Sequence, residues 1–435
     1  MLKVVHGVGA ASHAVLPDRS GRFQAMKIFA FDTMHVSVRL RWVMEHVPEV
    51  AKLISENDLL FGTVDTWLLW NLTGGKIHAT DYSNASFTGL YDFYIMEWSD
   101  FVLKVLELPH SVLPEVRDTS GEFGETPAAL FGSPIPIRAV VGDQQASLFG
   151  HCCFDPGDMK CSMGTGTFVC INTGKEIRTP SKYVMYPGVA WKIGHELTYM
   201  CETGSPGTGT ALDWGTQFGL FPSVSKADEV ARSVDSAGGA VFVNAFHGLG
   251  TPHHDGSAQA SIMGLSSHTT PAHIAHALLQ SLAFTFADLY EILARYFYSR
   301  RRTVRVDGGV SRSDFVLQTM ATATNAKMQR SSHHELTSLG AAYLAGLGSG
   351  FWESKSELIK NVVFEREFEP KDKGSIRAAL KLWRVAVQRT CKWPIFASES
   401  TLSDSAGGVE TGNGRKETGA QGGRGEKDDV ENREG

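Results

Sequence analysis

Short apolar segments that end in glycine-rich turns, each followed by a helical pattern, recur along this chain. Residues 135–141 predict a buried strand that runs into Gly142 and Asp143. Residues 304–306 predict a second strand, which runs into the turn 307–309. Strands that alternate with helices indicate an α/β architecture.

Further elements fit the same alternation. Residues 158–172 predict a β-hairpin around the glycine-rich turn 164–166. The other predicted strands are 197–201, which leads into the turn 204–209, and 241–246. The predicted helices are 42–59, 66–72 capped by Asp65, 146–150, 271–297 capped by Thr270, one opened by a capping box at Ser311 and Asp314, and 336–347.

The composition of the 435 residues is ordinary for a soluble globular protein, with 42% hydrophobic and 20% charged residues. The net charge of −6 offers no basic surface for nucleic acid. No stretch approaches the roughly 20 apolar residues of a membrane span, and no targeting pattern opens the chain. Six cysteines form no CxxC pair. We therefore expect a reduced, cytoplasmic protein with a small-molecule substrate.

The last 40 residues, 396–435, differ from the rest. From residue 398 onward they carry nine acidic and five basic side chains among Gly, Ser and Thr, and Leu402 is the last leucine. Such a segment buries too little apolar surface to offset the entropy of ordering, so we expect a disordered tail.

Asp143 is the first candidate for a catalytic residue, because ligands of open α/β sheets bind beyond the carboxyl ends of strands. One interpretation is that its carboxylate caps the following helix. The other is that it accepts the proton of a substrate hydroxyl during attack.

The glycine turns also have two interpretations each. Gly164, Thr165 and Gly166 either form an ordinary hairpin turn or a concave site whose backbone N–H groups bind phosphates. The turn 307–309 is either a tight turn or a place where the backbone closely approaches a nucleotide.

Three other motifs are set aside. The glycines at 204, 207 and 209 have the wrong spacing for a dinucleotide-binding loop, and no G-x-x-x-x-G-K-[ST] sequence occurs. His273 and His276 have helical spacing, but no third zinc ligand is fixed by spacing.

Several motifs together resemble the FGGY family of carbohydrate kinases, and within it the glycerol kinases. The stretches around Arg22 and Gly264 are closer to the glycerol kinase 5 branch than to the bacterial enzymes. The motifs that carry the resemblance are residues 61–75, 80–85, 113–116, 142–146, 164–166, 248–252, 306–309, 339–347 and 350–352.

The resemblance implies two ribonuclease-H-like domains of the actin/hexokinase type, the first incomplete, with a cleft between them. The first domain would span residues 1–152 and the nucleotide-binding domain 153–395. The implied reaction is ATP-dependent phosphorylation of glycerol to glycerol 3-phosphate, with Mg²⁺ bridging the phosphates. The implied partners are a small polyol and, by self-association, a second copy of the chain, with no insertion into a membrane.

Individual positions match the motifs of the family. Asp143 is similar to its catalytic base and Gln144 to a neighbouring substrate contact. The positions that correspond to ATP contacts are Gly164, Thr165, Gly166, Gly209, Asp213, Gly308, Gly309 and Ser313.

Some positions depart from the family pattern. An opening Asp-x-Gly-Thr hairpin and an Arg-Glu pair that holds glycerol have no counterparts, so we expect an N-terminally shortened chain. Met34 stands where the family has a substrate-contacting tyrosine. At four further positions the family residue differs: Ser313 replaces Asn, Asp213 replaces Gln, His254 replaces Trp and Gln259 replaces Arg.

These departures keep two alternatives open. One is a weakened or inactive nucleotide-binding protein. The other is a kinase for a different polyol or sugar.

Overall fold

The computed structural model describes residues 35–178, 184–297, 303–333, 335–371 and 374–393. Contacts divide the chain into Met1–Trp393 and Pro394–Gly435, and all described residues belong to the first unit. The predicted disordered tail therefore lies outside the described residues, as do Arg22 and Met34.

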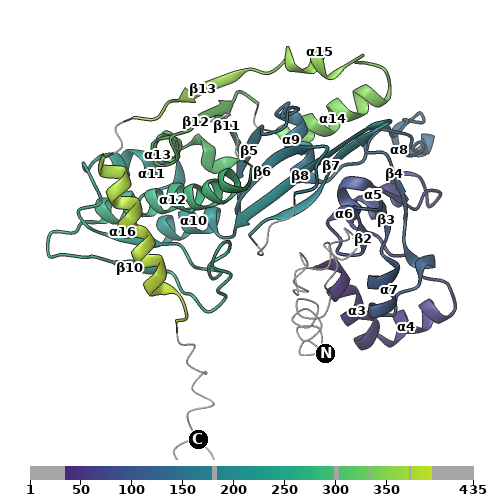
Figure 1. The fold of residues 1–435 in the computed structure, drawn as a ribbon, viewed down its shortest axis with the longest axis horizontal. Helices are drawn as coiled ribbons and strands as arrows, with labels where there is room; N and C mark the ends of the chain where they lie inside the picture. Colours follow the sequence, from purple (N-terminus) through teal and green to yellow (C-terminus); the bar gives the residue numbers. More distant parts are fainter. Residues whose placement is uncertain (1–34, 179–183, 298–302, 334, 372–373, 394–435) are drawn as a thin grey trace, which may run out of the picture. The chain divides into compact units, whose positions relative to one another are not determined.

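A seven-stranded mixed sheet is the centre of the second half of the chain (Figure 1). Its order is β13-β12-β11-β5-β6-β8-β7, with β11 parallel to both β5 and β12 and the other neighbours antiparallel. The predicted hairpin forms its middle, since Met163 pairs with Thr167 across the turn. The strands are β5 (Met159–Met163), β6 (Thr167–Gly174), β7 (Tyr186–Ile193), β8 (Glu196–Ser205), β11 (Thr303–Asp307), β12 (Lys327–Ser331) and β13 (Phe364–Phe368).

Helices cover both faces of this sheet, and the strand residues alternate accordingly. Met159 and Cys161 join the apolar core formed with α12 and α13, whereas Lys160 and Ser162 face α9. The helices are α9 (Asp143–Gly150), α10 (Thr208–Gln217), α11 (Ala227–Arg232), α12 (Pro271–Phe297), α13 (Asp314–Thr324), α14 (Leu336–Gly348), α15 (Lys355–Ile359) and α16 (Gly374–Thr390), with 3₁₀ turns η3 (Val224–Lys226) and η4 (Gly309–Arg312).

The helix predicted at 271–297 is confirmed as α12, whose bounds are the same. Leu278, Leu282 and Phe286, which recur every three or four residues, are all at most 1% exposed. By length and composition α12 could cross a membrane, but 72% of its most apolar window is buried here. It is placed as the core helix of a globular domain.

The first part of the described chain contains short helices and two small sheets. In one of them β1 (Ala79–Asp81) and β4 (Glu115–Arg117) are parallel, and in the other β2 (Tyr91–Asp92) and β3 (Glu97–Trp98) are antiparallel. The helices are α3 (Val36–His46), α4 (Pro48–Ser55), α5 (Val64–Leu72), α6 (Tyr82–Ser86), α7 (Asp100–Leu106) and α8 (Ala128–Phe131), with the 3₁₀ turn η2 (His110–Val112).

The buried strand predicted at residues 135–141 is wrong. The segment runs beside residues 119–126, where Ile137 N–H donates to Gly124 O at 2.8 Å, but it forms only isolated bridges. Pro136 has no N–H to donate, and Ile135 is 45% exposed. Asp143 therefore follows an irregular extended segment.

Other predicted elements have different ends in the structure. The helix expected at 42–59 is two helices, α3 and α4, because Pro48 starts a new helix instead of continuing the first. Residue Thr63, not Asp65, is the N-cap of α5, and Ser313, not Ser311, caps α13. The strand expected at 241–246 covers only Val241–Val243 (β9), which pairs with β10 (Ser261–Met263).

Candidate active site

Asp143 lies in the first turn of α9, with Gly142 as the N-cap residue. Its side chain is exposed, and its Oδ1 accepts the backbone N–H of Gln144 at 2.8 Å. This contact agrees with the capping interpretation, but it occupies only one carboxylate oxygen. Oδ2 has no hydrogen bond with any residue that the structure describes, which leaves it available to a ligand.

A short chain of hydrogen bonds holds the turn before Asp143. The Gly142 N–H donates to Ser83 Oγ at 2.8 Å, and Ser83 Oγ donates to Asp81 Oδ1 at 2.8 Å. Asp81 is fully buried, and burial raises its pKa to about 6, although bonds from Asn84 and Thr119 oppose the rise. The segment that begins α6 therefore fixes the backbone from which Asp143 projects.

The face of α9 that packs on the sheet is polar. One turn beyond Asp143, Ser147 Oγ donates to Asp307 Oδ2 at 2.9 Å, and Ser147 Oγ lies 3.4 Å from Ser162 Oγ. His151 Nε2 lies 3.4 Å from the same Asp307 oxygen. These contacts dock α9 at the carboxyl ends of β5 and β11.

The pKa values of titratable side chains in this interface are strongly shifted. Burial lowers the pKa of His151, so its ring is neutral at pH 7. Burial opposes ionisation of Asp307, but contact with His151 and the charge of Lys160 lower its pKa well below the usual range. Asp307 is therefore a buried carboxylate at the end of β11.

Lys160 and Glu202 complete this group. Lys160, 0% exposed, donates through Nζ to Ser162 Oγ at 2.9 Å and to Gln144 Oε1. Burial and the nearby charge of Asp143 raise the pKa of Glu202 to about 7, although Lys160 opposes the rise. Asp143 and Glu202 are thus close enough to repel each other, with one ammonium beside them.

The predicted phosphate turn meets two other glycine positions. Gly209 N–H donates to Thr165 O at 3.2 Å, and a Cβ on Gly209 would lie 3.1 Å from Gly164 O. Gly308, with φ of +88°, packs so tightly on β5 that a Cβ would lie 2.5 Å from Met163 O. Gly166 is buried, whereas Gly164 and Thr165 are exposed. The structure therefore brings five of the predicted positions, the three of the turn 164–166 with Gly209 and Gly308, together beside β5.

The other three residues predicted to contact ATP differ in their surroundings. Gly309 is exposed with open space around its Cα, and Asp213 is exposed one turn beyond Gly209 on α10. Ser313 Oγ accepts the Val316 N–H at 3.0 Å and donates to Asp228. This hydroxyl is thus already used in capping α13.

A protein-built metal centre is not part of this arrangement. Within the described ranges, no three His, Cys, Asp or Glu side chains group closely enough to hold a metal ion. Mg²⁺ at kinase sites needs only one or two carboxylates, because nucleotide phosphates and water supply the other ligands.

The sequence did not point to Lys160, Glu202 or Ser83 as residues of the candidate site. Lys160 alternates with buried Met159 and Cys161, which alone suggests a solvent-facing position. The informative signal was that helices flank this strand on both sides, so that both of its faces had to be covered. Glu202 lies in an apolar strand in the same way, but nothing in its neighbours predicts a partner.

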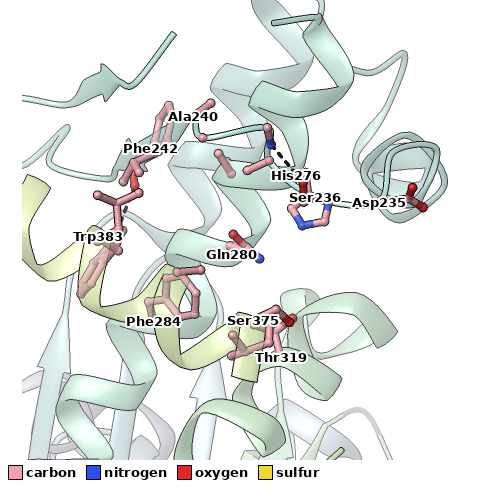
Figure 2. A pocket seen from close by; sticks show the side chains of 18 of the residues that line it. Asp235, Ser236, Ala240, Phe242, His276, Gln280, Phe284, Thr319, Ser375 and Trp383 are labelled. Atoms are coloured by element: carbon pink, nitrogen blue, oxygen red, sulfur yellow. Dashed lines mark hydrogen bonds between the residues drawn. The ribbon is translucent and has the colours of Figure 1, made fainter. Parts of the chain in front are cut away.

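A separate pocket lies away from these residues. Its volume is about 260 Å³, and α12, α13, α16 and the loop before β9 form it, with Gln280 and His276 of α12 among the lining residues (Figure 2). Phe284 and Trp383 form an aromatic wall, and Trp383 Nε1 donates to Phe242 O at 3.1 Å. None of the predicted site residues lines this cavity.

Both halves of the chain match domains of one known protein family. Residues 18–150 match the N-terminal domain of the FGGY family of carbohydrate kinases, and residues 159–349 match its C-terminal domain. Glycerol kinase 5 of Danio rerio is 43% identical over 399 residues, covering 90% of this chain and 75% of its own. Glycerol kinase 5 of Homo sapiens is 41% identical over 394 residues, with 90% and 74% covered.

Solved structures of carbohydrate kinases are also similar to this chain. Plasmodium falciparum glycerol kinase with ADP superposes with a TM-score of 0.79 at 29% identity, covering 90% of this chain and 78% of its own. Xylulose kinase from Lactobacillus acidophilus has a TM-score of 0.73 at 18% identity over 87% of this chain and 78% of its own, a likeness of fold. These neighbours confirm the predicted two-domain α/β fold of the actin/hexokinase type. The chain belongs to the FGGY family of carbohydrate kinases, enzymes that transfer a phosphoryl group from a nucleotide to a small molecule.

Proposed function

We propose that this chain phosphorylates glycerol to glycerol 3-phosphate with ATP, and that Asp143 is the catalytic base. The observation that carries the proposal is the convergence of Gly164, Thr165, Gly209 and Gly308 beside the strand on which the helix of Asp143 docks. The identity of more than 40% to proteins called glycerol kinase 5 supports glycerol as the substrate.

In this proposal the free Asp143 oxygen accepts the proton of a glycerol hydroxyl as its oxygen attacks the γ-phosphorus. The bond between that phosphorus and the β,γ-bridging oxygen breaks, and ADP leaves with the electron pair. The exposed turn offers the backbone N–H and the hydroxyl of Thr165 to the phosphates, whereas the Gly164 N–H already donates to Gly166 O at 2.9 Å. Most of the catalytic effect then comes from positioning and charge stabilisation.

Mg²⁺ enters this scheme with the nucleotide. When bound, it neutralises developing charge on the phosphates. The one free oxygen of Asp143 is assigned to the substrate proton, so water and the nucleotide phosphates would supply the ligands of the ion. A position in the cytoplasm, where ATP and glycerol are both available, completes the proposal.

The test is a coupled assay of ADP release with MgATP and a panel of glycerol, longer polyols and pentuloses. We expect turnover on glycerol at least tenfold above any other member of the panel. A preference for another substrate would contradict the choice of glycerol. Nucleotide that raises the melting temperature without turnover on any substrate would instead indicate a non-catalytic nucleotide-binding protein.

A further inference from the structure

We infer that Lys160 is a positioning residue that selects which end of the Gln144 carboxamide faces the substrate. The inference rests on the proposed function, since it concerns how a polyol hydroxyl is held beside Asp143. It assigns a role in substrate recognition to a side chain that is itself shielded from the ligand.

The position of Lys160 in the sheet is set by strand register. Lys160 pairs with Cys170 of β6, and Cys170 pairs with Glu202 of β8, so the three side chains form a row across one face. Cys170 Sγ lies 3.6 Å from Glu202 Oε2 within this row. Asp307 pairs with Ser162, two residues along β5 on the same face.

A fully buried ammonium is rare unless anionic groups compensate its lost hydration. Asp307 and Glu202 provide that compensation. Burial alone would lower the pKa of Lys160, but its interactions with Cys170, Asp307 and Glu202 outweigh burial and raise the pKa. Lys160 is therefore charged at neutral pH, and it can only donate hydrogen bonds.

That chemistry fixes the orientation of Gln144. An ammonium has no acceptor, so the atom of Gln144 that meets Lys160 Nζ has to be the carbonyl oxygen Oε1. The amide N–H groups of Gln144 are then left for the substrate. Without Lys160 the carboxamide could turn over and present its oxygen instead.

The resulting pair matches a hydroxyl group. Asp143 offers an acceptor, and Gln144 offers a donor from the adjacent residue, whose backbone N–H also binds Asp143 Oδ1 at 2.8 Å. A hydroxyl that donates to Asp143 and accepts from Gln144 satisfies both side chains. The oxygen that loses its proton is thereby held in one orientation.

A merely structural role for Lys160 is the competing explanation, because loss of its charge leaves Asp307 and Glu202 buried without their cation. The two explanations differ in how Lys160 and Gln144 couple. A positioning residue that acts through Gln144 has no further effect on the substrate once the Gln144 carboxamide is gone.

The experiment is a double-mutant cycle of Lys160→Met and Gln144→Ala in the full chain, with KM and kcat measured separately for glycerol and MgATP. We expect each single variant to raise KM for glycerol at least tenfold and to change KM for MgATP less than twofold. The double variant should resemble Gln144→Ala alone. Effects of the two substitutions that multiply, or an unchanged glycerol KM in folded Lys160→Met, would overturn the inference.

Lys192→Met is the matched control, because Lys192 also has a carboxylate partner, Asp118 at 2.5 Å, but stands outside the row of Lys160. It should leave both KM values within twofold of the wild type. If Lys160→Met does not fold, Lys160→Met/Glu202→Gln removes one anion with the cation and replaces it in the cycle.

Failure of the proposed function is distinguishable from failure of this inference. A wild-type chain that phosphorylates no polyol contradicts the function, and the cycle is then read from glycerol binding by calorimetry. Non-additive weakening of binding supports the role of Lys160. Additive weakening, or no binding by the wild type, overturns it.

Discussion

The carboxylate of Glu202 connects the candidate site with the stability of the domain. Its pKa rises from 4.5 in the unfolded chain to about 7 in the folded protein, chiefly through burial. The folded state then binds more protons than the unfolded state between these values. The free energy of unfolding therefore falls as pH rises through this window.

Glu202→Gln should remove this dependence. Relative to the wild type, we expect the variant to gain up to about 3 kcal/mol of stability between pH 4.5 and pH 7, since a pKa difference of one unit corresponds to about 1.4 kcal/mol. Urea unfolding of both proteins at both pH values measures this difference in the free energy of unfolding. Wild type and variant with parallel stability profiles would contradict the assigned burial of charge at Glu202.

At the scale of elements, contact between α9 and α14 depends on two glycines. A Cβ on Gly340 would lie 1.8 Å from Ala146 O, and a Cβ on Gly150 would lie 2.1 Å from Leu336 O. Both obstacles are backbone atoms, so the helices themselves would have to separate. The placement of Asp143 at the start of α9 relies on this close approach.

Gly340→Ala should consequently destabilise the protein by at least about 2 kcal/mol, in the range for overpacked interiors, and should also lower kcat. Chemical denaturation and the ADP-release assay measure the two effects. Gly256→Ala is the control, because a Cβ there meets nothing within 4 Å. A Gly340→Ala variant as stable as this control would show that the helices are not in contact.

The sequence predicts best those elements whose pattern lies within one continuous segment of the chain. The apolar period of α12 and the glycine turn between β5 and β6 gave correct elements because both depend on nearby residues. The buried strand predicted at residues 135–141 is wrong, because Pro136 lacks the N–H of a regular ladder and Ile135 is exposed in spite of the apolar sequence.

The same distinction applies to the candidate site. Asp143 and the turn 164–166 stand out locally, and a family resemblance supplied their roles. The tether from Ser83 to Gly142 spans 59 residues, and the contact from Lys160 to Gln144 joins a strand to a helix across the interface. Such contacts follow from tertiary packing, which periodicity and turn chemistry do not encode.

At the scale of the molecule, the proposed activity draws on three separate parts of the structure. The β5–β6 turn, the start of α10 and the turn after β11 supply glycine positions for phosphates. The turn before α9 supplies the carboxylate. The polar face between α9 and the sheet holds that turn in place through buried charges.

The rate of glycerol-dependent ADP release by Asp143→Asn tests this account most directly. We expect a loss of about 10²–10⁴-fold in kcat, because the amide cannot accept the hydroxyl proton, with an unchanged melting temperature. Asp58→Asn, at an exposed aspartate outside the site, should keep the wild-type rate. A folded Asp143→Asn protein that turns over glycerol as fast as the wild type would contradict the central claim.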